Sequence, residues 1–223
     1  MRLLIIRHAQ SANNAGALPR DADPPLTETG EWQAQQLAAA SGVLDDLDLL
    51  YISPMRRTLQ TAAPIAATTG LRARVFTGLH EWGGIWEERD GDASHLPGLT
   101  RDEMAAIIPE LFVPDDVLET GWWTGEVEAN DIRAALDLSR RNALRFLDYL
   151  WGNYSDAPNV AIITHGGFGS TLIEAALGVD QHPEHARFPQ YNTGHALIEF
   201  DGDLALMQWH NRLDHLPADL VTR

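Results

Sequence analysis

The chain has 223 residues, of which 44% are hydrophobic and 22% charged, as in an ordinary globular domain with a sizeable core. Its formal net charge of −16 argues against nucleic acid or an anionic membrane as a partner. There is no cysteine, and all 16 basic residues are arginine, which excludes cysteine nucleophiles, P-loop lysines and Schiff-base lysines. No apolar run approaches the roughly 18 residues of a membrane span, and the run Leu3 to Ile6 is too short for a signal peptide. We therefore expect a cytoplasmic protein.

Strand-like and helix-like segments alternate along most of the chain. The predicted strands are short apolar runs bounded by polar residues: 3–6, 48–52, 72–76, 160–164, 195–200 and 204–209. The predicted helices carry recognisable start and stop signals: 27–41, 54–70, 131–151 and 168–177. Ser53 is the expected N-cap of the second helix, and Gly152 the expected stop of the third. This order predicts an α/β three-layer sandwich, with a mostly parallel sheet, helices on both faces and one antiparallel edge hairpin.

Residues 82–128 interrupt this alternation, because they are rich in glycine, proline, tryptophan and acidic side chains. One short helix is predicted there, since Thr100 and Glu103 fit a capping box. We interpret the segment as a cap inserted at about 82–128 into a single domain that spans residues 1–223. Its tryptophans either line a substrate pocket or form the core of the cap; they are Trp82, Trp86, Trp122 and Trp123.

Chemically useful side chains follow the predicted strands. In chain order, the residues after the four parallel strands are Arg7 with His8, Arg57, Glu81, and His165 with Gly166 and Gly167. Because open α/β sheets bind ligands at the carboxyl ends of their strands, we expect these groups to converge. Guanidinium groups and imidazole favour a phosphoryl group, whose three oxygens need several charge-assisted donors. The Gly-Gly turn, which opens a helix, adds backbone N–H groups to such an anion site.

These groups together predict phosphoryl transfer. One histidine can attack phosphorus in line and form a phosphohistidine, which divides a difficult displacement into two easier ones. The residues alone leave open which histidine attacks. Arginines can stabilise the equatorial oxygens without a metal ion, and Glu81 can protonate the leaving oxygen and then deprotonate water.

We expect neither a metal ion nor a cofactor. Pro183 lies between His182 and His185 and disfavours a helical metal site there. The pairs Asp45-Asp46 and Asp115-Asp116 are interpreted as solvated surface rather than as magnesium ligands.

Five motifs together cover most of the chain outside the cap and the C-terminal tail. They are Arg7-His8-Ala9-Gln10-Ser11 with Asn14; Pro25-Leu26-Thr27-Glu28-Thr29-Gly30; Ser53-Pro54-Met55-Arg56-Arg57 with Gln60-Thr61-Ala62; Leu79-His80-Glu81 with Gly84; and Thr164-His165-Gly166. In order and spacing the chain resembles the histidine phosphatase superfamily, also called the phosphoglycerate mutase-like family.

The resemblance implies a role for each site residue. His8 would be the phosphorylated nucleophile, and Glu81 the proton donor, with Glu87 or Glu88 as the acid instead if the cap folds differently. The groups that would hold the phosphate are Arg7, His8, Asn14, Arg57, His165 and Gly166. The family usually has glycine and glutamate where this chain has Ala9 and Gln10. Alanine disfavours positive φ, so we expect an ordinary backbone at Ala9, while Gln10 removes a negative charge near the phosphate.

The sequence therefore favours a metal-independent phosphomonoester hydrolase that acts on a small phosphorylated metabolite. A phosphoglycerate mutase would need further cations in the cap, but only Arg89 and Arg101 lie between Trp82 and Glu128. A non-catalytic phospho-ligand-binding domain and a metal-dependent hydrolase are less favoured hypotheses. The acidic, tryptophan-rich cap favours a substrate with an apolar, aromatic or sugar portion and disfavours polyphosphates. The edge hairpin could pair with a second copy, which leaves a homodimer open.

Overall fold

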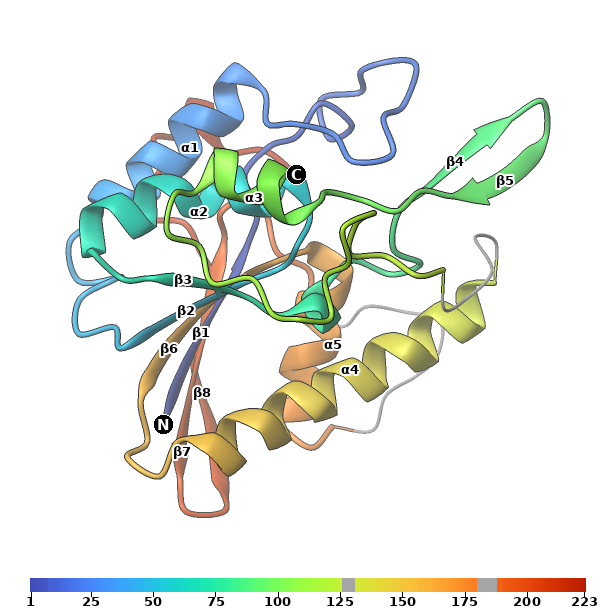
Figure 1. Ribbon diagram of the computed structural model, residues 1–223. Coiled ribbons are helices and arrows are strands. Elements are labelled where there is room, and N and C mark those ends of the chain that lie inside the picture. Colours follow the sequence, from blue (N-terminus) through green and yellow to red (C-terminus); the bar gives the residue numbers. More distant parts are fainter. Residues whose placement is uncertain (126–130, 180–187) are drawn as a thin grey trace.

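The computed structural model describes residues 1–125, 131–179 and 188–223, and its centre is a six-stranded sheet of order β3-β2-β6-β1-β7-β8 (Figure 1). The strands are β1 (Arg2–Arg7), β2 (Leu49–Ile52), β3 (Ala73–Val75), β6 (Asn159–Thr164), β7 (His195–Asp201) and β8 (Leu204–Arg212). The first four are mutually parallel, whereas β7 runs antiparallel to β1 and pairs with β8 at the edge. The predicted mostly parallel sheet with an antiparallel edge hairpin is confirmed.

Helices cover both faces of this sheet. They are α1 (Glu28–Ala39) and α2 (Arg56–Thr69) on one face, and α4 (Ile132–Asn153) and α5 (Gly166–Ala176) on the other (Figure 1). The alternation of side chains along β1 explains why both faces need cover. Leu4 and Ile6 pack with α1 and α2, while Leu3 and Ile5 pack with α4 and α5. The three-layer arrangement follows from this two-sided burial.

Two predicted helix signals are wrong. Ser53 is not the N-cap of α2: Met55 occupies that position without a side-chain cap, and the Ser53 hydroxyl binds a buried histidine instead. Gly152 does not stop α4, which continues one residue further to Asn153. Gly70 does close α2, since it adopts the left-handed conformation with φ of 70° that L side chains disfavour.

The cap segment contains one helix and one hairpin within its described residues. The helix α3 (Arg101–Ile107) begins at Thr100 with the predicted capping box, completed by Glu103. The hairpin of β4 (Trp86–Arg89) and β5 (Asp92–His95) was not predicted, because its short strands are rich in charged residues of low β-propensity. Figure 1 shows this hairpin projecting from the body of the molecule. Two short 3₁₀ turns, η1 (Thr77–Leu79) and η2 (Ala218–Leu220), complete the described elements.

The four cap tryptophans divide between the two predicted uses. Trp122 and Trp123 are buried and pack in the core together with α3, whereas Trp82 and Trp86 line a cavity. Gly84 accommodates this packing, because a Cβ there would lie 2.3 Å from the Trp123 ring. None of the helices among the described residues combines the length and the apolar composition needed to cross a bilayer.

Candidate active site

His8 lies directly after the central strand β1, at the carboxyl edge of the sheet. Its side chain is 4% exposed, and its backbone N–H donates to the carbonyl of Thr164 at 2.8 Å. The Nδ1 atom lies 2.7 Å from the carbonyl oxygen of Ala9, which can only accept, so Nδ1 carries the proton. Nε2 is then unprotonated and accepts from Arg57 Nε at 3.2 Å. This tautomer makes Nε2 the nucleophilic atom of the ring.

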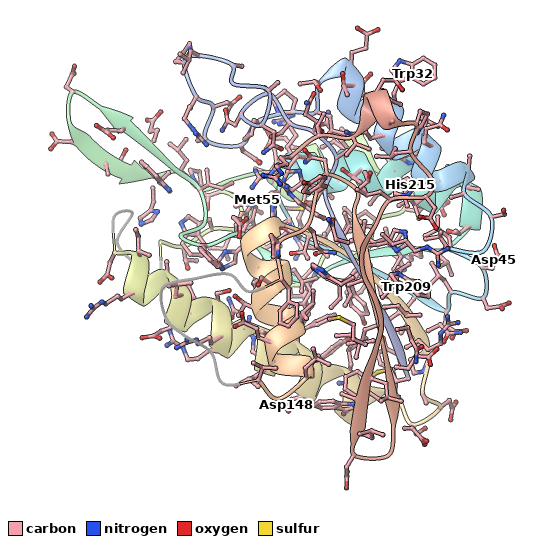
Figure 2. The ribbon with its side chains drawn as sticks, turned by 180° about the vertical axis from the view of Figure 1, so that it is seen from behind. Trp32, Asp45, Met55, Asp148, Trp209 and His215 are labelled. Carbon is pink, nitrogen blue, oxygen red and sulfur yellow. The ribbon has the colours of Figure 1, made fainter. Side chains whose placement is uncertain are left out.

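Arg57 connects the two predicted site histidines. It is the second residue of α2, and 9% of it is exposed. Besides His8, its guanidinium donates from Nη2 to His165 Nδ1 at 3.0 Å and to the sulfur of Met55 at 3.1 Å. Figure 2 shows Met55 near the N-terminal end of α5. The planar fork of one arginine therefore holds both rings in place.

His165 is the N-cap residue of α5 and is wholly buried. Because its Nδ1 accepts from Arg57, its Nε2 carries the proton and donates to the Ser53 hydroxyl at 2.8 Å. The rings of His165 and His8 meet edge to face, with centroids 5.2 Å apart. His165 thus lies behind Arg57 and is not part of the cavity wall described below.

Arg7 and Asn14 supply further donors. Arg7 Nη1 donates to the carbonyl of Gln190 at 2.7 Å, but its buried Nε has no partner among the described residues. Gly166 lies against the Arg7 guanidinium, since a Cβ there would be in van der Waals contact with Nε at 3.4 Å. Asn14 Oδ1 accepts from Ser11 and from the amide of Asn192. The Asn14 amide N–H groups make no hydrogen bond to the described part of the chain, so they remain donors.

Glu81 is held at the N-terminus of α5. Its carboxylate accepts backbone N–H bonds from Gly167 at 3.1 Å, Phe168 at 2.9 Å and Trp82 at 3.1 Å. A Cβ at Gly167 would lie 2.6 Å from Glu81 Oε1, so only glycine permits this approach. The prediction that the Gly-Gly turn serves phosphate is wrong at Gly167, whose N–H binds this carboxylate instead. The N-terminus of α5 thus fixes the position of the Glu81 carboxyl group.

The electrostatics of the cluster favour neutral histidines beside charged arginines. Burial first, and then the Arg57 guanidinium, hold the pKa of His8 well below its usual range, and the same two causes lower the pKa of His165. Burial also lowers the pKa of Arg7 and of Arg57, but a guanidinium stays protonated at neutral pH. The site therefore combines a neutral nucleophile with two fixed positive charges.

These residues form the base of a cavity of about 680 Å³. The base comprises Arg7, His8, Asn14, Arg57 and Glu81. The mouth comprises two segments, residues 19–24 and residues 82–88. Together the base and mouth are called the phosphate pocket below. All the predicted site residues thus line this cavity except His165 and Gly166, which lie behind its wall.

Sequence reasoning missed several residues that support the base. Asp23 lies 3.6 Å from Arg57 Nη1 and accepts the backbone N–H of Arg56, and burial raises its pKa. Thr61 accepts the backbone N–H of Ala9 at 3.0 Å. Asn192 donates to the carbonyl of His8 at 3.1 Å. Thr61 belongs to a recognised motif, but no local pattern marks Asn192, which arrives from a distant part of the chain.

The two departures from the family pattern have structural explanations. Ala9 has no positive φ, as expected, and is fully buried. Gln10 does not line the phosphate pocket, contrary to the expectation that it adjoins the phosphate. Its side chain accepts from the hydroxyl of Thr27, the N-cap of α1, at 2.6 Å. Gly30 allows the adjacent backbone contact, because a Cβ there would lie 2.1 Å from the Gln10 carbonyl oxygen.

No group of three His, Asp or Glu side chains in residues 1–125, 131–179 and 188–223 is arranged to hold a metal ion. His182 and His185 lie outside the described residues. Asp45, which the sequence places on the solvated surface rather than in a magnesium site, lies at the periphery of the molecule (Figure 2). It is far in that view from Met55, which marks the base of the phosphate pocket.

Comparisons with known proteins agree with this geometry. A family model described as histidine phosphatase superfamily (branch 1) matches residues 3–212. The chain is 30% identical over 192 residues to a glucosyl-3-phosphoglycerate phosphatase of Mycolicibacterium vanbaalenii, covering 82% of this chain and 77% of the relative. A shorter match, 38% identical over 86 residues, covers 37% of this chain but 15% of a PE-PGRS family protein of Mycobacterium tuberculosis.

The fold agrees with that of solved phosphatases. A crystal structure of a phosphoserine phosphatase from Entamoeba histolytica, in complex with 3-phosphoglyceric acid, superposes with a TM-score of 0.63. The two chains are 20% identical, and the match covers 97% of this chain and 99% of the other. This chain belongs to the histidine phosphatase superfamily. With its phosphatase relatives, the family identifies it as a phosphoric monoester hydrolase.

Proposed function

We propose that the chain hydrolyses small phosphate monoesters through a phosphohistidine formed on Nε2 of His8. The observation that carries this proposal is the tautomer of His8, with Nδ1 bonded to a backbone carbonyl and Nε2 facing a guanidinium in the base of the phosphate pocket. In the first step Nε2 attacks phosphorus, the N–P bond forms, and the bond to the leaving oxygen breaks. Glu81, which enters this step in its protonated form, gives its proton to that oxygen.

In the second step water attacks the phosphohistidine. Glu81, now ionised, takes a proton from the water as the O–P bond forms and the N–P bond breaks, which releases inorganic phosphate and restores both residues. Arg7, Arg57 and Asn14 would donate to the phosphoryl oxygens throughout both steps. The buried His165 would act by fixing Arg57, to which it is bonded. This assignment needs no metal ion and no cofactor.

Glu81 is a better placed acid than Glu87 or Glu88. Its carboxyl group lines the base of the phosphate pocket together with His8, and three N–H groups fix its position. Glu87 and Glu88 line the mouth, on the projecting strand β4. We therefore keep Glu81 as the proton donor and acceptor.

The hydrogen bonds of Arg101 favour hydrolysis over mutase chemistry, because they hold this cation outside the phosphate pocket. Its guanidinium donates to the backbone carbonyls of Val113, Pro114 and Val117 and does not line the phosphate pocket. A mutase should isomerise 3-phosphoglycerate in the presence of bisphosphoglycerate faster than it releases phosphate, and we expect the reverse.

The substrate class that the phosphate pocket favours is a monophosphate of a sugar or of another small apolar-faced alcohol. Trp82 and Trp86 offer aromatic faces in the mouth, and Asp21, Glu87 and Glu88 outnumber Arg20 there. This charge opposes a second phosphate. The names of the relatives, among them glucosyl-3-phosphoglycerate phosphatase, support a small phosphorylated metabolite. Cytoplasmic location, the boundaries of the cap and a homodimer remain predictions.

The test is a panel of phosphate monoesters assayed with wild type and His8→Ala in the presence of a chelator. We expect wild-type turnover to survive chelation and the variant to lose at least about 10⁴-fold in kcat. His210→Ala is a matched control, because His210 is half-buried on the edge strand β8 and does not line the phosphate pocket. Retained activity in His8→Ala would refute the mechanism. Absence of phosphate release from the whole panel by the folded wild type would favour a binding domain.

A further inference from the structure

A second cavity, of about 290 Å³, lies between β3, α4 and residues 112–116. Four of its ten lining residues are aromatic, namely Tyr51, Phe76, Phe112 and Tyr149. None of its described lining residues also lines the phosphate pocket. The volume is near the lower end of the range for small-molecule sites in proteins. We call this space the aromatic cavity.

Two arginines in the aromatic cavity are held by rings rather than by carboxylates. The guanidinium carbon of Arg74 lies 5.5 Å from the centroid of Phe112, and that of Arg145 lies 5.6 Å from the centroid of Phe76. Among the described residues neither arginine has a carboxylate within ion-pair distance, although the chain carries 32 acidic residues. Both keep their N–H donors for another acceptor.

One acid and the tyrosine phenols also belong to the aromatic cavity or adjoin it. Asp116 also lines the aromatic cavity, but its carboxylate accepts from the Thr77 hydroxyl at 2.7 Å. The Tyr51 hydroxyl lies 3.2 Å from that of Tyr149 and 2.7 Å from that of Tyr154. Burial, and then the bond to Tyr149, raise the pKa of Tyr51, so this hydroxyl stays neutral. The walls thus offer aromatic surface, a neutral hydroxyl group and two positive charges, against the one negative charge of Asp116.

We propose that the aromatic cavity binds a small aromatic carboxylate. Planar guanidinium groups match the two oxygens of a carboxylate, and the ring of the ligand would pack against the aromatic walls. Inorganic phosphate fits less well, because it has no ring to pack against Phe76 and Phe112.

This site is connected to the segment that carries Glu81. Arg145 Nη2 lies against η1, since a Cβ at Gly78 would be 3.0 Å from it. The chain continues from η1 through the buried His80, whose Nδ1 donates to the carbonyl of Glu81 at 2.7 Å. A carboxylate bound by Arg145 would therefore lie next to the segment that leads to Glu81.

The test is calorimetric titration with benzoate, with saturating inorganic phosphate in the buffer to occupy the phosphate pocket. We expect benzoate to bind, and its neutral isostere benzamide to bind at least about tenfold more weakly. Arg145→Met and Arg74→Met should each weaken benzoate binding by about tenfold. Arg72→Met is the matched control, because Arg72 stacks on the same Phe112 ring but does not line the aromatic cavity. The affinity of this variant for benzoate should equal that of the wild type.

Three results would overturn the proposal. They are equal binding of benzoate and benzamide, displacement of benzoate by phosphate, and absence of benzoate binding up to about 10 mM. Saturation-transfer NMR on the wild type gives a second measurement that does not depend on variants, since benzoate protons should contact Phe76 and Phe112. Because binding is measured without turnover, failure of the phosphohistidine mechanism would leave this test intact.

Discussion

The base of the phosphate pocket is fixed by buried hydrogen bonds between residues from separate strand ends, whereas its mouth consists of two exposed segments. In the base, Arg57 binds both His8 and His165, and Glu81 is held by three backbone N–H groups. The mouth is lined from residues 19–24 and from residues 82–88, which include part of β4. The rigid sheet positions the reacting groups, and the exposed segments select what reaches them.

Disturbing the base should cause the largest effect. Gly167→Ala would place a methyl group 2.6 Å from Glu81 Oε1 and 2.8 Å from the Trp82 ring, so the carboxylate must move. We expect kcat to fall by about 100-fold, because small misplacements of a reacting group have such costs. Steady-state kinetics on a sugar monophosphate measures this loss.

Gly152→Ala is the control for that change. Gly152 lies in α4 with open space around it, so alanine should leave kcat unchanged and raise the free energy of unfolding by about 0.5 kcal/mol. If Gly167→Ala folds and keeps wild-type kcat, the position of Glu81 does not matter for the reaction.

The pH dependence should report the buried environment of the base. The pKa of His8 is held well below the ordinary value of about 6.5, so the neutral nucleophile persists as the pH falls through that value. After correction for ionisation of the substrate phosphate, kcat/KM should fall by less than about twofold between roughly pH 6.5 and pH 5.5. A tenfold fall over that interval, as for a solvated histidine, would contradict the described site.

Changing the mouth should have the smallest effect and alter selectivity rather than chemistry. Glu88→Gln removes one exposed negative charge, so the preference for a sugar monophosphate over the bisphosphate should fall by about two- to fourfold at low salt. Glu119→Gln removes the same charge from an exposed position of the cap outside the phosphate pocket and should leave the preference unchanged. If Glu88→Gln and Glu119→Gln change this preference equally, the mouth does not select between monophosphate and bisphosphate substrates.

The base was more predictable from sequence than the mouth, for a physical reason. The residues of the base follow buried strands, and β-strand periodicity places Arg7, His8 and His165 at one edge of the sheet. The β4–β5 hairpin lacks such a pattern, because Glu87, Glu88 and Arg89 satisfy no apolar alternation. Functional residues at strand ends can thus be predicted from the sequence, whereas an exposed charged hairpin has no sequence pattern that predicts it.

The partners within the base could not be predicted in the same way. Nothing local shows that Gly167 binds Glu81 rather than phosphate, since this contact joins residues far apart in the chain. The same holds for Asp23 beside Arg57 and for Asn192 behind His8. These contacts depend on tertiary packing. The division of the tryptophans, with Trp122 buried and Trp86 at the mouth, depends on it as well.

The most direct test of the account is to trap the phosphorylated protein during turnover. Wild type is mixed with a monophosphate substrate, quenched in base within milliseconds, and analysed by mass spectrometry of its peptides. We expect one added phosphoryl group on the peptide that contains His8, stable in base and lost in acid, and none in His8→Ala. A phosphoryl group on another residue, or full turnover by His8→Ala, would contradict the assignment of Nε2 of His8 as the nucleophile.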